Sequence, residues 1–209
     1  MTKILVTVDV VLFTIRDRTL HLLLIKRLAK PFQSRYALPG GFVREDESLD
    51  TAAIRELREE TGVEKVYLEQ LYTFGDPKRD PRGRVITVAY YALVPHNQLL
   101  RAGTDASDAA WFQVTDLPPL AFDHRRIAEY AHQRIRNKLD YTNVGFELLP
   151  DKFTLTELQR VHEAILGENL DKRNFRRKII QKGIVKPAKE WQQTGRKPAQ
   201  LYRFAASTR

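Results

Sequence analysis

The hydrophobic pattern of the chain changes about two thirds of the way along. Residues 3–14 and 20–27 are runs rich in leucine and β-branched residues on either side of a charged turn, and residues 71–94 repeat the order of strand, Pro/Gly/Asp loop and strand. A glutamate-rich helical segment separates the two pairs of runs. This part of the chain is therefore predicted to be α+β, with a mixed sheet between helices.

A helical pattern follows the last of these strands, in the segment "HRRIAEYAHQRIRNKL" at residues 124–139. Asp123 is expected to cap this helix, and Phe122 to pack as a hydrophobic staple just outside it. The helix is expected to end a first domain that spans residues 1–140.

Residues 141–209 predict a small second domain that begins with two helices. Thr154 and Glu157 form a capping-box pattern, and Gly167 follows a stripe of apolar residues as a helix terminator. The next segment, "DKRNFRRKIIQKG", is expected to turn Phe175 and Ile179 towards a core. The predicted stripe of the first helix is Leu155, Leu158, Val161, Ile165 and Leu166.

Two short strands around a basic loop complete this domain, in "IVKPAKEWQQTGRKPAQLYRF". Trp191, Leu201 and Tyr202 are expected to join its core. The order of helix, basic helix and basic hairpin is that of a winged helix.

Charge is distributed unevenly between the two parts. The chain carries a net charge of +9, and residues 141–209 hold 14 lysines and arginines against 7 acidic residues, whereas the first 140 residues hold 21 against 19. A basic terminal region suggests contact with nucleic acid or another anionic surface. Cysteine is absent, which excludes disulfides and thiolate ligands. Asp9 and two threonines interrupt the first apolar run, so we expect a cytoplasmic protein with no membrane partner.

The segment "GFVREDESLDTAAIRELREETGV", residues 41–63, crowds three glutamates onto one side of a predicted helix. Like charges three or four residues apart cost roughly 0.2–0.5 kcal/mol per pair, so something positive should compensate for Glu56, Glu59 and Glu60. A loop followed by a carboxylate-lined helix suits Mg²⁺ or Mn²⁺, which prefer oxygen ligands and substrate phosphates.

This segment matches, position for position, the signature of the Nudix hydrolase family, which residues 1–140 resemble. The resemblance implies a Nudix fold with Glu56, Glu59 and Glu60 as metal ligands and catalytic residues. It also implies that Arg55 orients a carboxylate and that Gly40 and Gly41 let the chain pass close to the site. Such metals polarise a pyrophosphate and activate a water. Asp105 and Asp108 are both candidates for the general base.

The segment "YTFGDPKRDPRGRVITVAYYAL" resembles the corresponding region of Nudix proteins that bind ADP-ribose. Two arginines in such a loop could hold a diphosphate by bidentate hydrogen bonds. The predicted ligand-binding residues are Arg35, Gly40, Gly41, Phe74, Asp76, Arg79, Asp80 and Arg82.

Over its full length the chain resembles the Nudix-related transcriptional regulators of bacteria, through "PLAFDH", "FTLTELQRVHEAILG", "FRRKI" and "GRKPAQLYRF" behind the Nudix segment. That resemblance implies a homodimeric repressor of NAD metabolism, with a Nudix sensor for ADP-ribose and a winged helix for double-stranded operator DNA. His124 is either a helix cap or part of a domain or dimer junction. The effector could also be another nucleotide or a sugar, and a magnesium-dependent ADP-ribose pyrophosphatase, alone or combined with DNA binding, is the alternative function.

The basic helix of the second domain is expected to contact DNA. Lysines suit phosphates, and arginine and asparagine can also reach base edges in the major groove. The candidate DNA-binding residues are Lys172, Arg173, Asn174, Arg176, Arg177 and Lys178 on the helix, with Arg196 and Lys197 on the wing.

Overall fold

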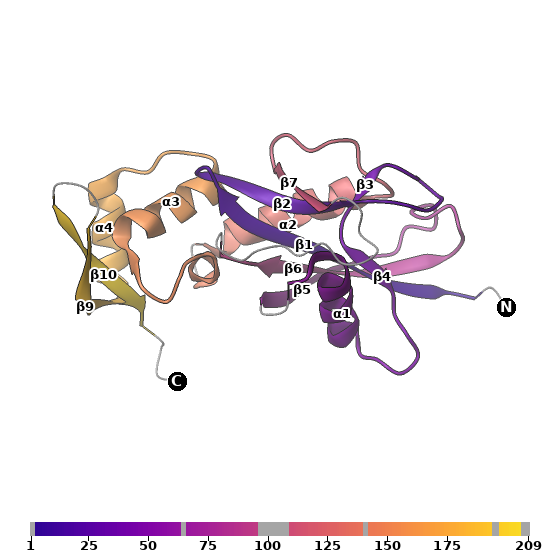
Figure 1. Ribbon diagram of the computed structural model, residues 1–209, viewed down its shortest axis with the longest axis horizontal. Helices are drawn as coiled ribbons and strands as arrows, with labels where there is room; N and C mark the ends of the chain where they lie inside the picture. Colours follow the sequence, from indigo (N-terminus) through magenta and orange to yellow (C-terminus); the bar gives the residue numbers. More distant parts are fainter. Residues whose placement is uncertain (1–2, 64–65, 96–108, 140–141, 194–196, 206–209) are drawn as a thin grey trace. The chain divides into compact units, whose positions relative to one another are not determined.

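The computed structural model describes residues 3–63, 66–95, 109–139, 142–193 and 197–205 (Figure 1). The chain divides into two compact units. The first comprises residues 1–14 and 20–134, and the second comprises residues 15–19 and 135–209. No helix in the described part of the chain is long and apolar enough to cross a bilayer.

A mixed sheet forms the centre of the first unit, which confirms the predicted class. Strand β1 pairs in parallel with β6, in register from Leu5 opposite Val85 to Phe13 opposite Leu93, and pairs antiparallel with β4. The order along the sheet is β3-β2-β1-β6-β5, and β7 pairs with β2. The described strands of this sheet are β1 (Leu5–Arg16), β2 (Thr19–Lys26), β3 (Tyr36–Ala37), β4 (Gly40–Phe42), β5 (Tyr67–Phe74), β6 (Val85–Leu93) and β7 (Ala109–Gln113).

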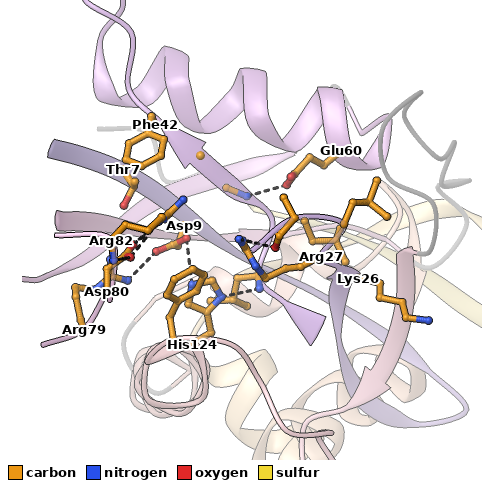
Figure 2. A pocket seen from close by; sticks show the side chains of 17 residues that line it. Thr7, Asp9, Lys26, Arg27, Phe42, Glu60, Arg79, Asp80, Arg82 and His124 are labelled. Atoms are coloured by element: carbon orange, nitrogen blue, oxygen red, sulfur yellow. Dashed lines mark hydrogen bonds and ion pairs between the residues drawn. The ribbon is translucent and has the colours of Figure 1, made fainter. Parts of the chain in front are cut away.

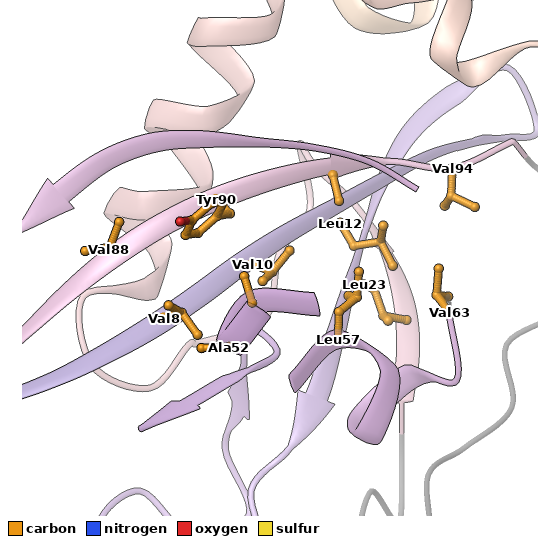
Figure 3. Packing of buried hydrophobic residues seen from close by; sticks show 12 residues of the cluster. Val8, Val10, Leu12, Leu23, Ala52, Leu57, Val63, Val88, Tyr90 and Val94 are labelled. Atoms are coloured by element: carbon orange, nitrogen blue, oxygen red, sulfur yellow. The ribbon is translucent and has the colours of Figure 1, made fainter. Parts of the chain in front are cut away.

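One face of this sheet packs against helix α1 (Leu49–Thr61) through a close-packed apolar cluster (Figure 3). Because side chains alternate along a strand, every second residue of β1 and β6 reaches this face. Ser48 caps α1 at its start, accepting from the Thr51 N–H at 3.2 Å, and Gly62 ends it in the left-handed conformation. The cluster includes Val8, Val10 and Leu12 of β1, Val88 and Tyr90 of β6, and Ala52, Ala53 and Leu57 of α1.

The opposite face of the sheet is also covered. Val11 and Phe13, which alternate with the residues facing α1, are fully buried. Helix α2 (His124–Lys138) lies on this side, and its Ile127, Ala128 and Ala131 are fully buried (Figure 1). The sheet therefore lies between helices, as expected.

The second unit has the element order of a winged helix. Its capping box is confirmed: the Glu157 N–H donates to Thr154 Oγ1 at 3.1 Å, and the Thr154 N–H donates to Glu157 Oε2 at 2.7 Å. Gly167 ends the first helix at a φ of 72°, as predicted. The elements are the 3-10 helix η1 (Val144–Leu148), β8 (Phe153–Thr154), α3 (Leu155–Leu166), α4 (Lys172–Gln181), β9 (Val185–Gln193) and β10 (Pro198–Phe204), with the strands in the order β8-β10-β9.

The core of this unit gathers both helices and the first residue of β9. Phe175 and Ile179 of α4 are buried in it, as predicted, and Tyr202 packs against it while remaining half-buried. The prediction for Trp191 was wrong, because its side chain is 60% exposed. Val185 is the residue of β9 in the core, whereas residues 189–193 at the other end of the strand are all exposed, so neither face is buried there.

Candidate functional site

A cavity of about 330 Å³ opens in the first unit (Figure 2). Residues of β1, β2, β4, α1, the loop 79–82 and the start of α2 line it. This volume lies in the range of small-molecule sites, roughly 300–1,000 Å³. We call it the Nudix-unit cavity.

The floor of the Nudix-unit cavity is a buried network of charged and polar side chains. Asp9 Oδ2 accepts from Arg79 Nη2 at 3.3 Å, and Asp9 Oδ1 lies 3.5 Å from His124 Nε2. Arg79 also donates to both carboxylate oxygens of Asp123, at 2.8 and 3.1 Å. Both carboxylate oxygens of Asp123 therefore accept from Arg79. The sequence had suggested that this side chain would instead accept from a backbone N–H in the first turn of α2.

His124 is held at both ring nitrogens. Its Nδ1 accepts from the backbone N–H of Leu38 at 2.9 Å, so this nitrogen carries no proton, and Nε2 faces Asp9. Burial lowers the pKa of His124, against the opposing effect of Asp9. The ring is thus a neutral structural bridge between β1, the β3–β4 connection and α2.

Arginines and phenylalanines surround the mouth of the Nudix-unit cavity. The guanidinium of Arg82 lies 4.9 Å from the ring centre of Phe42 and 5.3 Å from that of Phe122, and Arg27 lies 4.8 Å from the Phe122 ring. Arg82 also makes a bidentate pair with Asp80. Burial, and then the positive charge of Arg82, lower the pKa of Arg27. Two cations this close together favour an anionic ligand.

Phe122 reaches this mouth through an unusual backbone conformation. Its φ of 52° lies in the left-handed region, and its ring packs edge-on against Phe32, with the ring centres 4.9 Å apart. Phe122 therefore contributes to the cavity wall, rather than acting as the expected hydrophobic staple of α2.

Glu60 of α1 points into the same cavity. Its Oε2 accepts from the backbone N–H of Gly40 at 2.8 Å, and burial, with Glu56 and Asp9 nearby, raises its pKa to about 8. Glu56 lies behind Gly41, where an added Cβ would come within 2.3 Å of Glu56 Oε1. Glycine at position 41 therefore allows the close approach that the motif suggested.

Arg55 compensates for much of the glutamate crowding on α1. It donates to Glu47 at 2.6 and 2.9 Å, to Glu56 Oε1 at 2.6 Å and to Glu59 Oε2 at 3.2 Å. Pairing with Arg55 lowers the pKa of Glu47 to about 2. Burial raises the pKa of Glu56, while the side chain of Glu59 is 51% exposed.

In the described part of the chain, no three acidic or histidine side chains lie close enough together to hold a metal ion by themselves. Glu56 and Glu60 nevertheless offer the oxygen ligands that Mg²⁺ prefers. Mg²⁺ is commonly held by one or two carboxylates together with substrate phosphates, so these two residues fit a magnesium site that a diphosphate completes. Glu59 instead lies among Arg44 and Arg55.

Helix α4 presents the basic surface of the second unit. Asp171 caps it, accepting from the Asn174 N–H at 2.8 Å. Arg176 is half-buried and donates to Thr156 of α3 at 3.1 Å. The exposed candidates for DNA contact are Lys172, Arg173, Asn174, Arg177 and Lys178 on the helix, with Lys197 before β10, and Arg196 lies outside the described residues.

Comparison with known proteins covers both units. Residues 4–131 match the NUDIX domain model, and residues 145–204 match the model of the NrtR DNA-binding winged helix domain. The chain is 42% identical over 205 residues to a protein of Acinetobacter baylyi named ADPR responsive transcriptional repressor NtrR, covering 96% of this chain and 82% of that protein. The chain belongs to the NrtR family of Nudix-related regulators.

Two solved NrtR structures from Shewanella oneidensis resemble this NrtR-family chain. The structure of NrtR with a 27mer DNA matches with a TM-score of 0.83 and 39% identity, covering 96% of this chain and 93% of that one. The NUDIX domain of the same protein with ADP ribose matches with a TM-score of 0.61 and 42% identity, covering 65% of this chain and 90% of that one.

The structure brings together five of the eight ligand residues that the sequence predicted for this NrtR-family chain. Arg35 is exposed beside Phe32, Phe74 packs against Tyr130, and the carboxylate of Asp76 accepts from the Lys78 N–H, so none of these three lines the Nudix-unit cavity. Gly40, Gly41, Arg79, Asp80 and Arg82 do line it.

Sequence reasoning missed Asp9, Arg27, Phe42 and Phe122 as cavity residues. Asp9 carried a usable signal, since a carboxylate inside an apolar strand is rarely buried without a partner. The candidate bases Asp105 and Asp108 lie outside the described residues, so both stay predictions.

Proposed function

We propose that this NrtR-family chain is a DNA-binding transcriptional repressor of NAD metabolism whose Nudix unit senses ADP-ribose. The observation that carries the proposal is that one chain combines an anion-favouring Nudix cavity with a basic winged helix. The 42% identity to the A. baylyi repressor, over 96% of this chain, supports the proposal.

The chemistry of the Nudix-unit cavity fits ADP-ribose. Arg27 and Arg82 stand at its mouth, where guanidinium groups can donate to a diphosphate. Phe42 and Phe122 offer ring faces to the adenine or the riboses. Arg79 is paired with Asp9 and Asp123, so we assign it to holding the floor rather than to the diphosphate.

Operator binding is assigned to α4 of a cytoplasmic homodimer. Arg173 and Arg177 are exposed cations on this helix, suited to phosphates and base edges. Dimeric readers place recognition helices about one DNA turn apart, ~34–36 Å or a multiple, so a change in their separation releases DNA. ADP-ribose has this effect if it binds the released state more tightly.

Metal-dependent ADP-ribose pyrophosphatase activity is the second candidate, alone or combined with repression. The observation favouring it is the intact set of carboxylates on α1, with Glu56 and Glu60 beside the Gly40–Gly41 turn. Bound Mg²⁺ or Mn²⁺ would polarise the diphosphate. Arg55 would position Glu56, and Glu60 would stay oriented by the Gly40 N–H.

The test is a DNA mobility shift with the DNA upstream of the neighbouring genes, with ADP-ribose titrated in the presence and absence of Mg²⁺ while AMP is measured in the same samples. Specific binding that ADP-ribose weakens or strengthens, with little AMP formed, supports the repressor. Rapid AMP release with only salt-sensitive, nonspecific DNA binding makes the protein an enzyme instead.

A further inference from the structure

A second cavity, of about 410 Å³, lies wholly within the second unit. The end of α2, η1, α3 and α4 line it. Its buried walls are apolar, with Leu139, Phe175 and Ile179 less than a tenth exposed, and half-buried Phe146 and Leu170 complete them. We call it the winged-helix cavity.

The rim of the winged-helix cavity is basic. Lys178 on α4 and Lys182, which caps the end of α4, are exposed lining residues. Arg136 lies near the end of α2 and donates to the Leu166 carbonyl at 2.6 Å. Asp171 is the acidic residue among the described lining residues, and its carboxylate already caps α4. The rim therefore has a net positive charge around an apolar interior.

We propose that the winged-helix cavity is a second ligand site, which takes a small anion with an apolar body, such as an aromatic or medium-chain aliphatic carboxylate or sulfonate. The apolar walls remove the body of such a ligand from water, and a few well-placed polar groups fix its orientation. The charged head remains at the rim, beside Lys182 and Lys178. A cation is disfavoured there by the same charges.

This site has a direct route to DNA affinity. Asn174 and Lys178 line the winged-helix cavity and also belong to the candidate DNA-binding residues of α4. An anionic head at the rim competes with DNA phosphates for Lys178, so an occupied cavity lowers operator affinity. This regulatory step rests on the proposed repressor function, whereas binding of the anion does not.

Anilinonaphthalene sulfonate, an aromatic sulfonate whose fluorescence rises in apolar surroundings, is the probe for the full-length protein. We expect one saturable site per chain, from which octanoate displaces the dye and saturating ADP-ribose does not. Dye that is displaced by ADP-ribose, or that binds without saturation, would overturn the proposal, because it would then report the Nudix-unit cavity or general surface adsorption.

Two variants, each with a matched control, test whether the dye binds in the winged-helix cavity. Lys182→Glu should weaken dye binding about tenfold by reversing a rim charge, whereas Lys186→Glu, on exposed β9 outside the cavity, changes the net charge equally and should leave it unchanged. Leu166→Trp should fill the cavity and abolish binding, and Ile54→Trp on α1 is its matched control. Equal effects of Lys182→Glu and Lys186→Glu would overturn the site even if Leu166→Trp failed to fold.

The DNA readout separates this proposal from the proposed function. Octanoate should weaken operator binding by wild-type protein and have a smaller effect on Lys182→Glu, with ADP-ribose regulation intact in both. If ADP-ribose never alters DNA binding while the dye still maps to the winged-helix cavity, the repressor model fails and the second ligand site stands. If ADP-ribose alters DNA binding but neither Lys182→Glu nor Leu166→Trp alters dye binding, the second ligand site is refuted.

Discussion

Asp9 and Arg79 form an ion pair across 70 residues of sequence, with Asp9 Oδ2 and Arg79 Nη2 3.3 Å apart. Both side chains are buried, because that of Asp9 is 8% exposed and that of Arg79 is 3% exposed. Asp123 pairs with the same guanidinium from the start of α2. Because both carboxylates already engage Arg79, this residue ties the loop before β6 to the sheet and to α2. Our proposal therefore assigns the diphosphate of ADP-ribose to Arg27 and Arg82 at the cavity mouth.

Asp9→Ala should therefore destabilise the first unit. Removing one partner of a buried pair leaves the other charge poorly compensated, and because Asp123 remains, we expect a loss of about 2 kcal/mol in the free energy of unfolding. Urea unfolding measures it. Asp76→Ala, at an exposed position in the same region, is the control, and equal losses for the two variants would show that the pair contributes nothing.

Arg82→Ala should weaken ADP-ribose binding, while Arg35→Ala should not. Charged hydrogen bonds contribute about 1.5–3 kcal/mol, which corresponds to roughly a 10- to 150-fold rise in Kd. Arg35 is exposed and does not line the Nudix-unit cavity. Isothermal titration calorimetry measures the Kd of ADP-ribose for both variants. A larger effect of Arg35→Ala would contradict the structural assignment and support Arg35 as the ligand-binding residue predicted from the sequence.

The contribution of His124 to stability should fall as the pH drops below about 6.5. Burial lowers its pKa in the folded protein below the ordinary value of 6.5, so in this range the unfolded chain binds more protons, and acid favours unfolding. The contribution is complete above pH 6.5 and is lost below it. The titratable groups that face the ring are Asp9, Arg79, Asp123 and Arg27.

The measurement is the free energy of unfolding between pH 7.5 and 5.5, for wild type and His124→Gln. Glu60 titrates in the same range with the opposite sign, because its raised pKa, about 8, favours the folded state in acid. The difference between the two proteins isolates His124. The same pH slope in both would contradict its burial as a neutral ring.

Replacing Arg173 and Arg177 by alanine should weaken operator binding and make it less dependent on salt, by about one released counterion for each phosphate that the variant no longer neutralises. Arg44→Ala, which removes a positive charge from the exposed surface of the first unit, is the matched control. Affinity for ADP-ribose should be unchanged in every one of these variants. Arg176 is a poorer choice, because its replacement would also remove the bond to Thr156. Loss of both activities together would indicate misfolding.

Local patterns were sufficient to predict the glutamate helix, the other α-helices and the longer strands, but not the short elements β3, β4, η1 and β8. The capping box at Thr154, the left-handed Gly167 and the alternating residues of β1 all act within a few residues, so their sequence signals survive in the fold. The floor of the Nudix-unit cavity could not be read in this way. Asp123 has the pattern of a helix cap, and only the tertiary arrangement brings Arg79 to its carboxylate.

The wrong prediction for Trp191 also results from tertiary contacts that the local sequence does not show. A tryptophan in a strand is typical of a core position, but residues 189–193 of β9 are all exposed, and the sequence does not show that this end of the strand is uncovered. Burial of a strand residue depends on which elements cover it, and that information is not local.

The bond from the Leu38 N–H to His124 Nδ1 makes a single amide proton a reporter of the ring 86 residues away. Most backbone amides in this sheet donate to carbonyls, whose accepting capacity does not change with pH. The Leu38 amide has an acceptor that disappears when His124 takes a second proton. Its hydrogen exchange with solvent should therefore speed up in acid relative to neighbouring strand amides, recording the protonation of one buried imidazole without a label or a mutation.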